Sequence, residues 1–268
     1  MQIIKVPGIN GLSKTKGCEK AGNEILLTLK EIYTNESGKV VEPKSLDLEE
    51  IHLDNGNLEL TNNLIYENSL EVYESKPFLV FLGGDHSISY SLTRGFLKYC
   101  KNEGKKPCLI VFDAHPDLME PVNFNFPTHE EWLRGIIEQG FPAENILLVG
   151  LRNSYQDELK YLKEKGVRTI SLNNLLVDLE DTCDTIMEFA DGKELYLSLD
   201  IDVVDPFYAP GTGYREPGGL TSRQLIYLVQ RMKKMKNLKA VDIVEINPDK
   251  DKDKMTVKLG AKILSELL

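Results

Sequence analysis

The chain alternates between two hydrophobic patterns. Continuous apolar runs predict strands buried on both faces, at 78–82, 108–112, 145–150, 167–171, 194–199 and 238–245. Apolar residues spaced three or four apart predict helices at 19–33, 62–73, 130–138, 155–165, 182–190, 222–234 and 256–267, with a further helix running to about residue 99. A strand within 1–17 and another within 45–53 are also expected. This order predicts a three-layer α/β/α fold with a mainly parallel, doubly wound sheet.

The same pattern gives no sign of a domain boundary. We find no linker rich in Gly, Pro or Ser, no low-complexity tract and no internal repeat. A chain of 268 residues is long enough to bury one sizeable core. We therefore expect a single domain over residues 1–268.

Composition restricts the partners and the compartment. The net charge of −10 argues against a nucleic-acid-binding surface, which needs a basic face. The N-terminus shows no signal-peptide pattern, and no apolar run approaches the ~18 residues that a membrane span needs. The four cysteines form no CxxC pair, which favours a reduced, cytoplasmic protein: Cys18, Cys100, Cys108 and Cys183.

Three predicted strands end in polar clusters. Their sequences are Gly83-Gly84-Asp85-His86, Asp113-Ala114-His115-Pro116-Asp117 and Asp200-Ile201-Asp202. A strand period of two would place Asp200 and Asp202 on the same side. Because ligands bind beyond the carboxyl ends of strands in open parallel sheets, we expect the three clusters to meet there.

The clusters offer six candidate metal ligands, namely His86, Asp113, His115, Asp117, Asp200 and Asp202. A zinc site uses four ligands and prefers nitrogen or sulfur donors. Carboxylates with some imidazole suit Mn²⁺, and the ligand set alone leaves Fe, Co or Ni open. Four carboxylates match the charge of two divalent cations, and shared carboxylates can hold such ions ~3.5–4 Å apart to activate a water. The set predicts a binuclear hydrolase site.

Taken in order, the clusters resemble the motifs of the ureohydrolase family, which includes arginase, agmatinase and related guanidino or formimino hydrolases. The family motifs GGDH, DAHxD and SxDxDxxDP correspond to residues 83–86, 113–117 and 198–206. The similarity continues at 209–213, 218–221 and 244–248, whereas the first 75 residues match only loosely.

The resemblance implies how two Mn²⁺ ions would share the ligands. One ion would bind His86, Asp113, Asp117 and Asp200. The other would bind His115, Asp113, Asp200 and Asp202. A hydroxide bridging the ions would attack the central carbon of a guanidinium or amidine. Members of the family are usually trimers or hexamers, so the resemblance also implies a homo-oligomer.

Two further residues match family positions that act on the substrate. Glu245 matches the glutamate that pairs with the guanidinium, and a planar N–H fork suits a carboxylate. The alternative is an ordinary acidic residue at a strand end. His129 falls where the family often keeps a histidine that carries protons to the leaving amine. Here Glu130 follows instead of the usual Gly, and a surface histidine at a helix start is the alternative.

The substrate is less well determined. The family usually continues Thr-Pro-Glu after Gly213, but this chain has Tyr214-Arg215-Glu216. Arg215 would suit a substrate carboxylate, or it is a solvated surface charge. The segment 118–128 lacks the Ser/Asn pattern with which arginases hold the α-carboxylate of arginine.

We therefore predict a hydrolase that converts a guanidino compound, of agmatine or arginine type, to urea and an amine, with agmatine or a related compound favoured over arginine. Hydrolysis of a formimino substrate such as formiminoglutamate is the alternative within the family. A non-catalytic family member and a one-zinc deacetylase of similar architecture are the rivals outside it. The six intact ligand positions argue against the first rival.

Overall fold

A computed structural model describes residues 1–11 and 13–268. In this part of the chain eight strands form one sheet, and every neighbouring pair is parallel. The strands are β1 (Gln2–Val6), β2 (Leu48–Glu50), β3 (Leu79–Gly83), β4 (Pro107–Phe112), β5 (Ile146–Leu151), β6 (Arg168–Ser171), β7 (Glu194–Asp200) and β8 (Leu238–Val244). Across the sheet their order is β2-β1-β3-β8-β7-β4-β5-β6.

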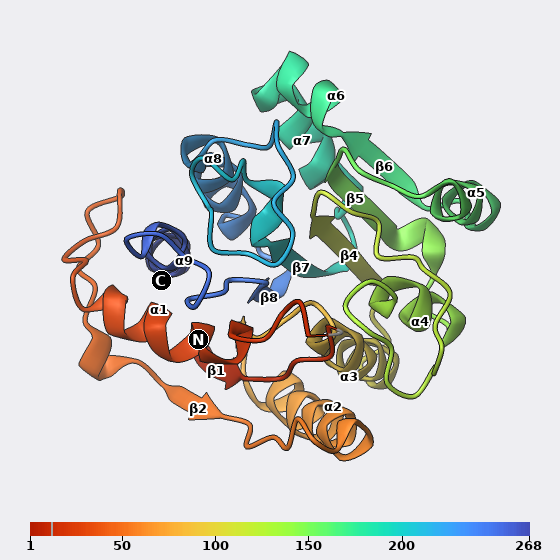
Figure 1. Cartoon of the computed structure of the whole chain (residues 1–268), viewed down its shortest axis with the longest axis horizontal. Helices are drawn as coiled ribbons and strands as arrows, with labels where there is room; N and C mark the ends of the chain where they lie inside the picture. The colour runs from red at the N-terminus through yellow and green to blue at the C-terminus, as the bar shows by residue number, and fades with distance from the viewer. Residues whose placement is uncertain (12) are drawn as a thin grey trace.

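Helices cover both faces of this sheet. They are α1 (Ala21–Leu29), α2 (Leu58–Ser75), α3 (Ile88–Asn102), α4 (Trp132–Glu138), α5 (Gln156–Lys165), α6 (Leu172–Val177), α7 (Leu179–Phe189), α8 (Ser222–Lys233) and α9 (Met255–Leu267). Short 3₁₀ turns are η1 (Cys18–Lys20), η2 (Pro43–Ser45), η3 (Ala143–Asn145) and η4 (Ile201–Val203). Helices α1 and α6 to α9 pack on one face, and α2 to α5 on the other (Figure 1).

The inner strands supply side chains to two separate cores. In β4, Cys108, Ile110 and Phe112 belong to the core under α1 and α6 to α9. Leu109 and Val111 belong to the core under α2 to α5. All five are at most 1% exposed. Successive strand residues face opposite sides, so a strand covered on both sides is apolar over most of its length, as the continuous apolar runs predicted.

The order of the strands determines where the site forms. The chain places β3 and then β4 with a gap between them, and β8 and β7 fill that gap later. The four central strands are therefore β3, β8, β7 and β4, side by side and parallel. Their carboxyl ends bring together segments that lie up to about 160 residues apart, such as His86 and Glu245, which are hydrogen-bonded neighbours.

The predicted three-layer fold is confirmed, and the sheet is parallel throughout. One reason given for the site was wrong. Strand β7 ends at Asp200, and Asp202 lies in the 3₁₀ turn η4, so the strand period does not align them. The Asp200 carboxylate instead accepts the backbone N–H of Asp202 at 2.7 Å, and this local turn brings the two side chains to the same site.

One helix was not predicted, and one strand is much shorter than predicted. Helix α6 was not predicted, because Leu172–Val177 is too short to show a helical period; its N-terminus is capped by the Ser171 hydroxyl, which accepts from Asn174 N at 3.2 Å. The strand expected within 45–53 is only Leu48–Glu50, at the sheet edge.

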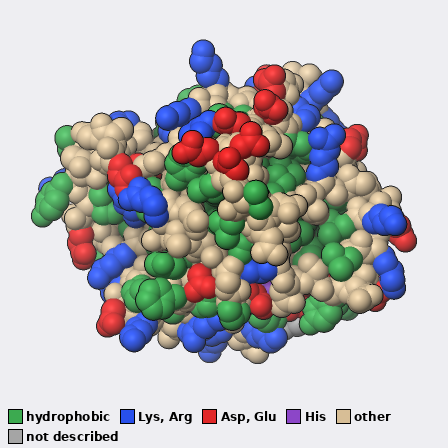
Figure 2. Space-filling view, turned by 90° about the horizontal axis from the view of Figure 1, so that it is seen from above, with side chains coloured by type: hydrophobic (Ala, Val, Ile, Leu, Met, Phe, Trp, Pro, Cys, Tyr) green, Lys and Arg blue, Asp and Glu red, His purple; other side chains and the backbone are tan. Residues whose placement is uncertain are grey.

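The surface carries charged side chains of both signs. On the face in Figure 2, Lys and Arg side chains are scattered around the edge and acidic side chains gather near one side. None of the described helices combines the length and the apolar character that crossing a membrane requires. All four cysteines are free and buried.

Candidate metal centre and substrate cavity

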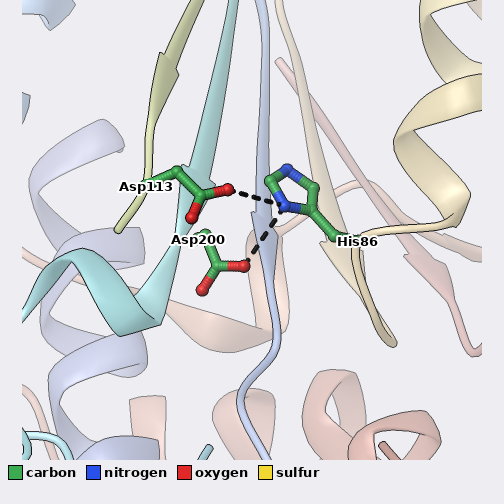
Figure 3. A group of neighbouring side chains, drawn as sticks. All are labelled: His86, Asp113 and Asp200. Carbon is green, nitrogen blue, oxygen red and sulfur yellow. Dashed lines mark ion pairs between the residues drawn. The ribbon is translucent and has the colours of Figure 1, made fainter. Parts of the chain in front are cut away.

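The six predicted ligands lie at the carboxyl ends of three central strands. His86 follows β3, Asp113 begins the loop after β4, and Asp200 is the last residue of β7. Figure 3 shows the three side chains converging from these strands, with both carboxylates directed at one ring nitrogen of His86. The structure thus brings together residues from segments that are distant in sequence.

His86 Nδ1 is the centre of the first group. Its distances to carboxylate oxygens are 3.1 Å for Asp113, 3.0 Å for Asp117 and 3.2 Å for Asp200. His86 is 1% exposed. Trp132 packs against the imidazole at 4.6 Å between ring centroids and donates to Asp117 Oδ2 at 2.8 Å. A single nitrogen is therefore surrounded by three buried carboxylates.

His115 Nδ1 is the centre of the second group. It lies 2.9 Å from Asp202 Oδ2 and 3.7 Å from Asp113 Oδ1. Two groups of three residues could each hold a metal ion, because their ligand atoms lie close together. The first group is His86, Asp113 and Asp200, and the second is Asp113, His115 and Asp202. Asp113 is common to both groups, which is the arrangement expected of a carboxylate shared by two ions.

Backbone N–H groups hold one oxygen of each central carboxylate. Asp113 Oδ1 accepts from His115 N at 2.7 Å, and Asp202 Oδ1 accepts from Ala114 N at 3.1 Å. Asp200 Oδ1 accepts from Asp202 N. The other oxygen of each carboxylate faces a histidine Nδ1. The backbone thus fixes the carboxylates and leaves one oxygen of each for a ligand.

Both histidines are held at their second nitrogen. Ser198 Oγ donates to Asp242 Oδ1 at 2.7 Å, so it accepts from His86 Nε2 at 2.9 Å. His115 Nε2 lies 3.3 Å from Glu216 Oε1 and donates to it. A hydrogen on Nε2 leaves the lone pair on Nδ1, which is the nitrogen that faces the carboxylates. These acceptors favour the tautomer that a metal ligand needs. Without metal, the carboxylates outweigh the effect of burial and raise the pKa of both histidines, so a metal ion would replace a proton on Nδ1.

Without metal ions, these buried carboxylates repel one another. Burial, with the charge of Asp113 added, raises the pKa of Asp117 to about 7. Burial and then the charges of Asp202 and Asp113 raise the pKa of Asp200 well above its usual range. Cations would remove this cost, because they neutralise the carboxylates directly.

The residues fit a pair of divalent cations. Of the described residues, buried His86 Nδ1 and Asp113 Oδ2 have no hydrogen-bond partner, although each faces the shared space. Such atoms are costly unless something coordinates them. The four carboxylates also carry the charge that two divalent cations would balance. Carboxylate-rich ligands with imidazole suit Mn²⁺ better than Zn²⁺.

Glu245 and His129 lie beside this cluster as one pair. Glu245 Oε1 accepts from His86 N at 3.0 Å and from His129 Nδ1 at 3.1 Å. Glu245 Oε2 and His129 Nε2 are buried and have no partner among the described residues. Burial lowers the pKa of His129, but the hydrogen bond and charge of Glu245 outweigh it and raise the pKa to about 9. His129 is 4% exposed, so the alternative of a surface histidine is wrong.

Two of these residues have a strained backbone. Asp117 has φ of 52° and Glu245 has φ of 63°, in the left-handed region that favours glycine. Strain of this kind costs about 1–3 kcal/mol and persists where the surroundings fix it, most often at functional sites. Both side chains are directed into the cluster as a result.

A cavity of about 280 Å³ opens onto the cluster. Its walls combine the predicted residues with others from separate loops: Lys14, His115, Asp117, Met119, His129, Glu130, Asn153, Ser154, Tyr155, Glu158, Asp200, Asp202, Tyr214, Glu216 and Glu245. Glu245, whose Oε2 has no partner among the described residues, therefore lines the same cavity as several of the candidate metal ligands.

Several cavity residues were not predicted. Lys14, Glu130 and Glu158 carry no motif and reach the cavity only through the fold. Among the cavity residues outside the motifs, Tyr214 was noted in the sequence, because the family usually has Thr after Gly213. Arg215, in contrast, is absent from the cavity walls and donates to the backbone oxygens of Pro210 and Lys250, at 2.7 and 2.9 Å. Arg215 is exposed, which favours the alternative of a surface charge over a contact with a substrate carboxylate.

The N-terminal segment is also part of the site. Asp85 is fully buried and accepts from Asn10 N at 2.7 Å and from Thr15 Oγ1 at 2.6 Å. These bonds hold the segment against the GGDH turn and place Lys14 at the cavity. The loose family match of the first 75 residues therefore concealed a structural contribution.

Comparison with known proteins agrees with this geometry. A sequence model described as "Arginase family" matches residues 1–268. The chain belongs to the arginase family. A mitochondrial arginase from Medicago truncatula is 33% identical over 211 residues, which make up 76% of this chain and 59% of the relative. An agmatinase from Bacillus subtilis (strain 168) is 31% identical over 225 residues, or 83% and 73% of the two chains.

Solved structures of other arginase-family proteins have the same fold. A formimidoylglutamase from Bacillus subtilis aligns with a TM-score of 0.89 and 25% identity, over 99% of this chain and 85% of that one. A proclavaminate amidino hydrolase from Streptomyces clavuligerus aligns with a TM-score of 0.87 and 26% identity, over 99% and 89%. This arginase-family chain spans only 59% of the length of the plant arginase that it matches.

Proposed function

We propose that the protein is a metal-dependent hydrolase that cleaves a C–N bond of a guanidino compound to give urea and an amine. One observation carries the proposal. Glu245 and His129, each with one buried atom that has no partner among the described residues, line the same cavity as members of both candidate metal groups. A carboxylate, a proton carrier and a metal centre can together hydrolyse an amidine.

The protein's own residues would orient the substrate and move one proton. Glu245 Oε1 already has two donors, so Oε2 would accept an N–H of the planar guanidinium. His129, held through Nδ1, would give the proton on Nε2 to the leaving nitrogen as the C–N bond breaks. Water supplies the oxygen of urea, and the amine leaves with the proton.

The six predicted ligands would hold the metal ions. His86, Asp113, Asp117 and Asp200 would take one and His115, Asp113, Asp200 and Asp202 the other, in agreement with the two groups that share Asp113. Two divalent cations would supply the positive charge that makes water a nucleophile near neutral pH. We propose Mn²⁺ because the donor set is rich in carboxylates, with Fe, Co or Ni as alternatives.

The first experiment is an assay of urea and ammonia release by Mn²⁺-loaded protein. Agmatine, arginine, guanidinobutyrate, guanidinopropionate and formiminoglutamate are offered in parallel. Urea from one of the first four is the expected result, with agmatine or a related compound preferred over arginine. Asp202→Asn should lose one metal equivalent and activity. Full metal content and activity in that variant would contradict the ligand assignment.

Hydrolysis of a formimino substrate is the second candidate. It is favoured by the cationic Lys14 in the cavity wall and by the similarity in fold to a solved formimidoylglutamase. Lys14 Nζ donates to the Tyr214 hydroxyl at 2.7 Å and has further donors for a substrate carboxylate. Formamide or ammonia from formiminoglutamate alone would establish this candidate, and silence on every substrate would favour a non-catalytic metal-binding protein.

We further propose that the protein is a cytoplasmic homo-oligomer, a trimer or hexamer. The free state of all four cysteines supports a reducing compartment. Large apolar side chains that are exposed in the isolated chain support an interface: Tyr33, Val122, Val177 and Phe207. Light scattering coupled to gel filtration measures the mass directly, and the mass of a monomer would contradict an oligomer.

A further inference from the structure

Tyr214 contacts both histidines at the entrance of the cavity. Its ring lies almost parallel to the imidazole of His129, at 5.6 Å between centroids and 14° between planes. It meets the ring of His115 edge-on, at 5.5 Å and 61°. Tyr214 is also where the chain departs from the Thr that the family usually has after Gly213. An aromatic residue therefore covers the pair of imidazoles where a small residue is usual.

The hydroxyl of Tyr214 joins two other loops. It accepts from Lys14 Nζ at 2.7 Å and donates to Glu130 Oε1 through a short hydrogen bond. Lys14 lies in the N-terminal segment and Glu130 in the loop before α4, so residues 116 positions apart are joined through one phenol. The ring cannot leave its position without breaking both bonds.

The same oxygen of Glu130 lies near the free nitrogen of His129. Glu130 Oε1 is 3.9 Å from His129 Nε2, which is outside hydrogen-bond distance. His129 Nε2 is buried and has no partner in the described part of the chain. The bond to Tyr214 holds this carboxylate oxygen at that distance from the nitrogen. The tyrosine thus keeps an acidic neighbour from capturing the proton carrier.

We propose that Tyr214 is a positioning residue for His129, resting on the function proposed above. Its ring fixes the plane of the imidazole, whose Nδ1 is already held by Glu245. Its hydroxyl keeps Glu130 away from Nε2, so that this nitrogen remains available to the leaving group of the substrate. Tyr214 itself takes no proton and forms no bond to substrate.

Kinetics of Mn²⁺-loaded variants separate the two contacts. Tyr214→Phe keeps the ring and frees Glu130, so kcat should fall roughly tenfold with little change in KM, as expected for one charge-assisted hydrogen bond formed in the wrong place. Tyr214→Phe combined with Glu130→Ala should recover most of that loss. Tyr214→Thr loses the stacking as well, and Glu130→Ala should not rescue it.

A control lies in the same loop. Tyr208→Phe also removes one hydroxyl, for which the described residues offer no hydrogen-bond partner, and it should leave kcat unchanged. A fall in kcat in this control, equal to that in Tyr214→Phe, would show that any change in the loop is harmful and would overturn the proposal.

Imidazole NMR on metal-free protein gives a readout that needs no turnover. The chain has four histidines, and the signals of His129 are those that vanish in His129→Asn. Tyr214→Phe should move the ¹⁵N signal of His129 Nε2 and slow exchange of its proton, as Glu130 binds it. The double variant with Glu130→Ala should reverse the change.

These readouts keep the two proposals apart. If no substrate is hydrolysed, the proposed function fails while the NMR result still tests Tyr214. An unchanged His129 signal in Tyr214→Phe, or a double variant no better than the single one, would overturn the positioning role.

Discussion

Glu216 fixes the ring of His115 in the way that Ser198 fixes the ring of His86. The substitution Glu216→Ala leaves Nε2 of His115 without an acceptor. The tautomer of His115 with a free Nδ1 is then no longer favoured. We expect affinity for the second metal ion to fall by about 10–100-fold, which is usual for loss of such a partner. Titration with Mn²⁺ measures it.

Ser198→Ala provides the matched comparison, because it should lower the affinity for the other metal ion, which would bind through His86. If Glu216→Ala and Ser198→Ala weakened the same single ion, the assignment of the two histidines to separate ions would be wrong.

Gly213 controls the space around the substrate end of Glu245. A Cβ at this position would lie 3.5 Å from Glu245 Oε2, in ordinary contact, and Gly213 is not one of the glycines with positive φ. Gly213→Ala should therefore fold normally and bind metal normally, while its methyl group crowds the guanidinium. KM should rise roughly tenfold, the effect of one misplaced methyl group in a pocket. A variant with unchanged KM would place the substrate elsewhere.

At the scale of single residues, the sequence shows the candidate metal ligands but not the residues that support them. The six ligands stand in three short motifs, each directly after an apolar run, so their types and spacing were visible. Glu216, Lys14 and Glu130 act through contacts with residues 84 to 200 positions away, and no local pattern marks them. Arg215 was misleading for the same reason, since only the fold shows that its donors bind backbone oxygens.

Gly150, the next-to-last residue of strand β5, lies directly behind Asp113 of the candidate metal centre. Gly150 has φ of 102°, and a Cβ there would meet Val203 Cγ2 at 2.6 Å and Asp113 O at 3.1 Å. Gly150→Ala combines a strained backbone with overpacking against η4, so we expect a loss of about 2–4 kcal/mol in unfolding free energy. Urea denaturation measures this loss.

Gly192→Ala is the control for backbone strain alone. Gly192 has φ of 68°, and no atom lies within 4 Å of its added Cβ. Its loss should be only about 1–2 kcal/mol. An equal loss of unfolding free energy in Gly150→Ala and Gly192→Ala would show that overpacking against η4 contributes nothing.

Long, buried helices and strands were easier to predict from the sequence than short or exposed ones. Strands such as β3 and β4 are buried on both faces, and their apolar runs left no alternative assignment. Helix α6 has six residues and the strand β2 only three, and neither is long enough to establish a period. The turn η4 was missed because a side chain, not a repeating pattern, creates it.

For the whole molecule, the cluster links stability to both pH and metal. The folded-state pKa of Asp117, about 7, exceeds its unfolded value, so the folded protein binds more protons than the unfolded chain. The stability of metal-free protein should therefore fall as the pH rises from about 4 to about 7. Metal needs deprotonated ligands, so the rise in Tm on adding Mn²⁺ should grow over the same range.

Thermal unfolding with Mn²⁺ and with EDTA, at several pH values, measures both trends. Asp117→Asn should flatten the pH dependence of the metal-free protein. An increase in metal-free stability with pH would contradict the assignment. The expectation of one domain stays a prediction, and a single calorimetric transition would support it.

The strand order has a consequence for the synthesis of the protein. Strands β3 and β4 become central only when β7 and β8, made last, enter the gap between them. A nascent chain that has reached α7 therefore carries two partial sheets with open inner edges, and none of the ligands of β7 is yet in place. Such edges favour wrong pairing between chains. The metal centre can be completed only at the end of translation, when the ion can also report that the sheet has closed.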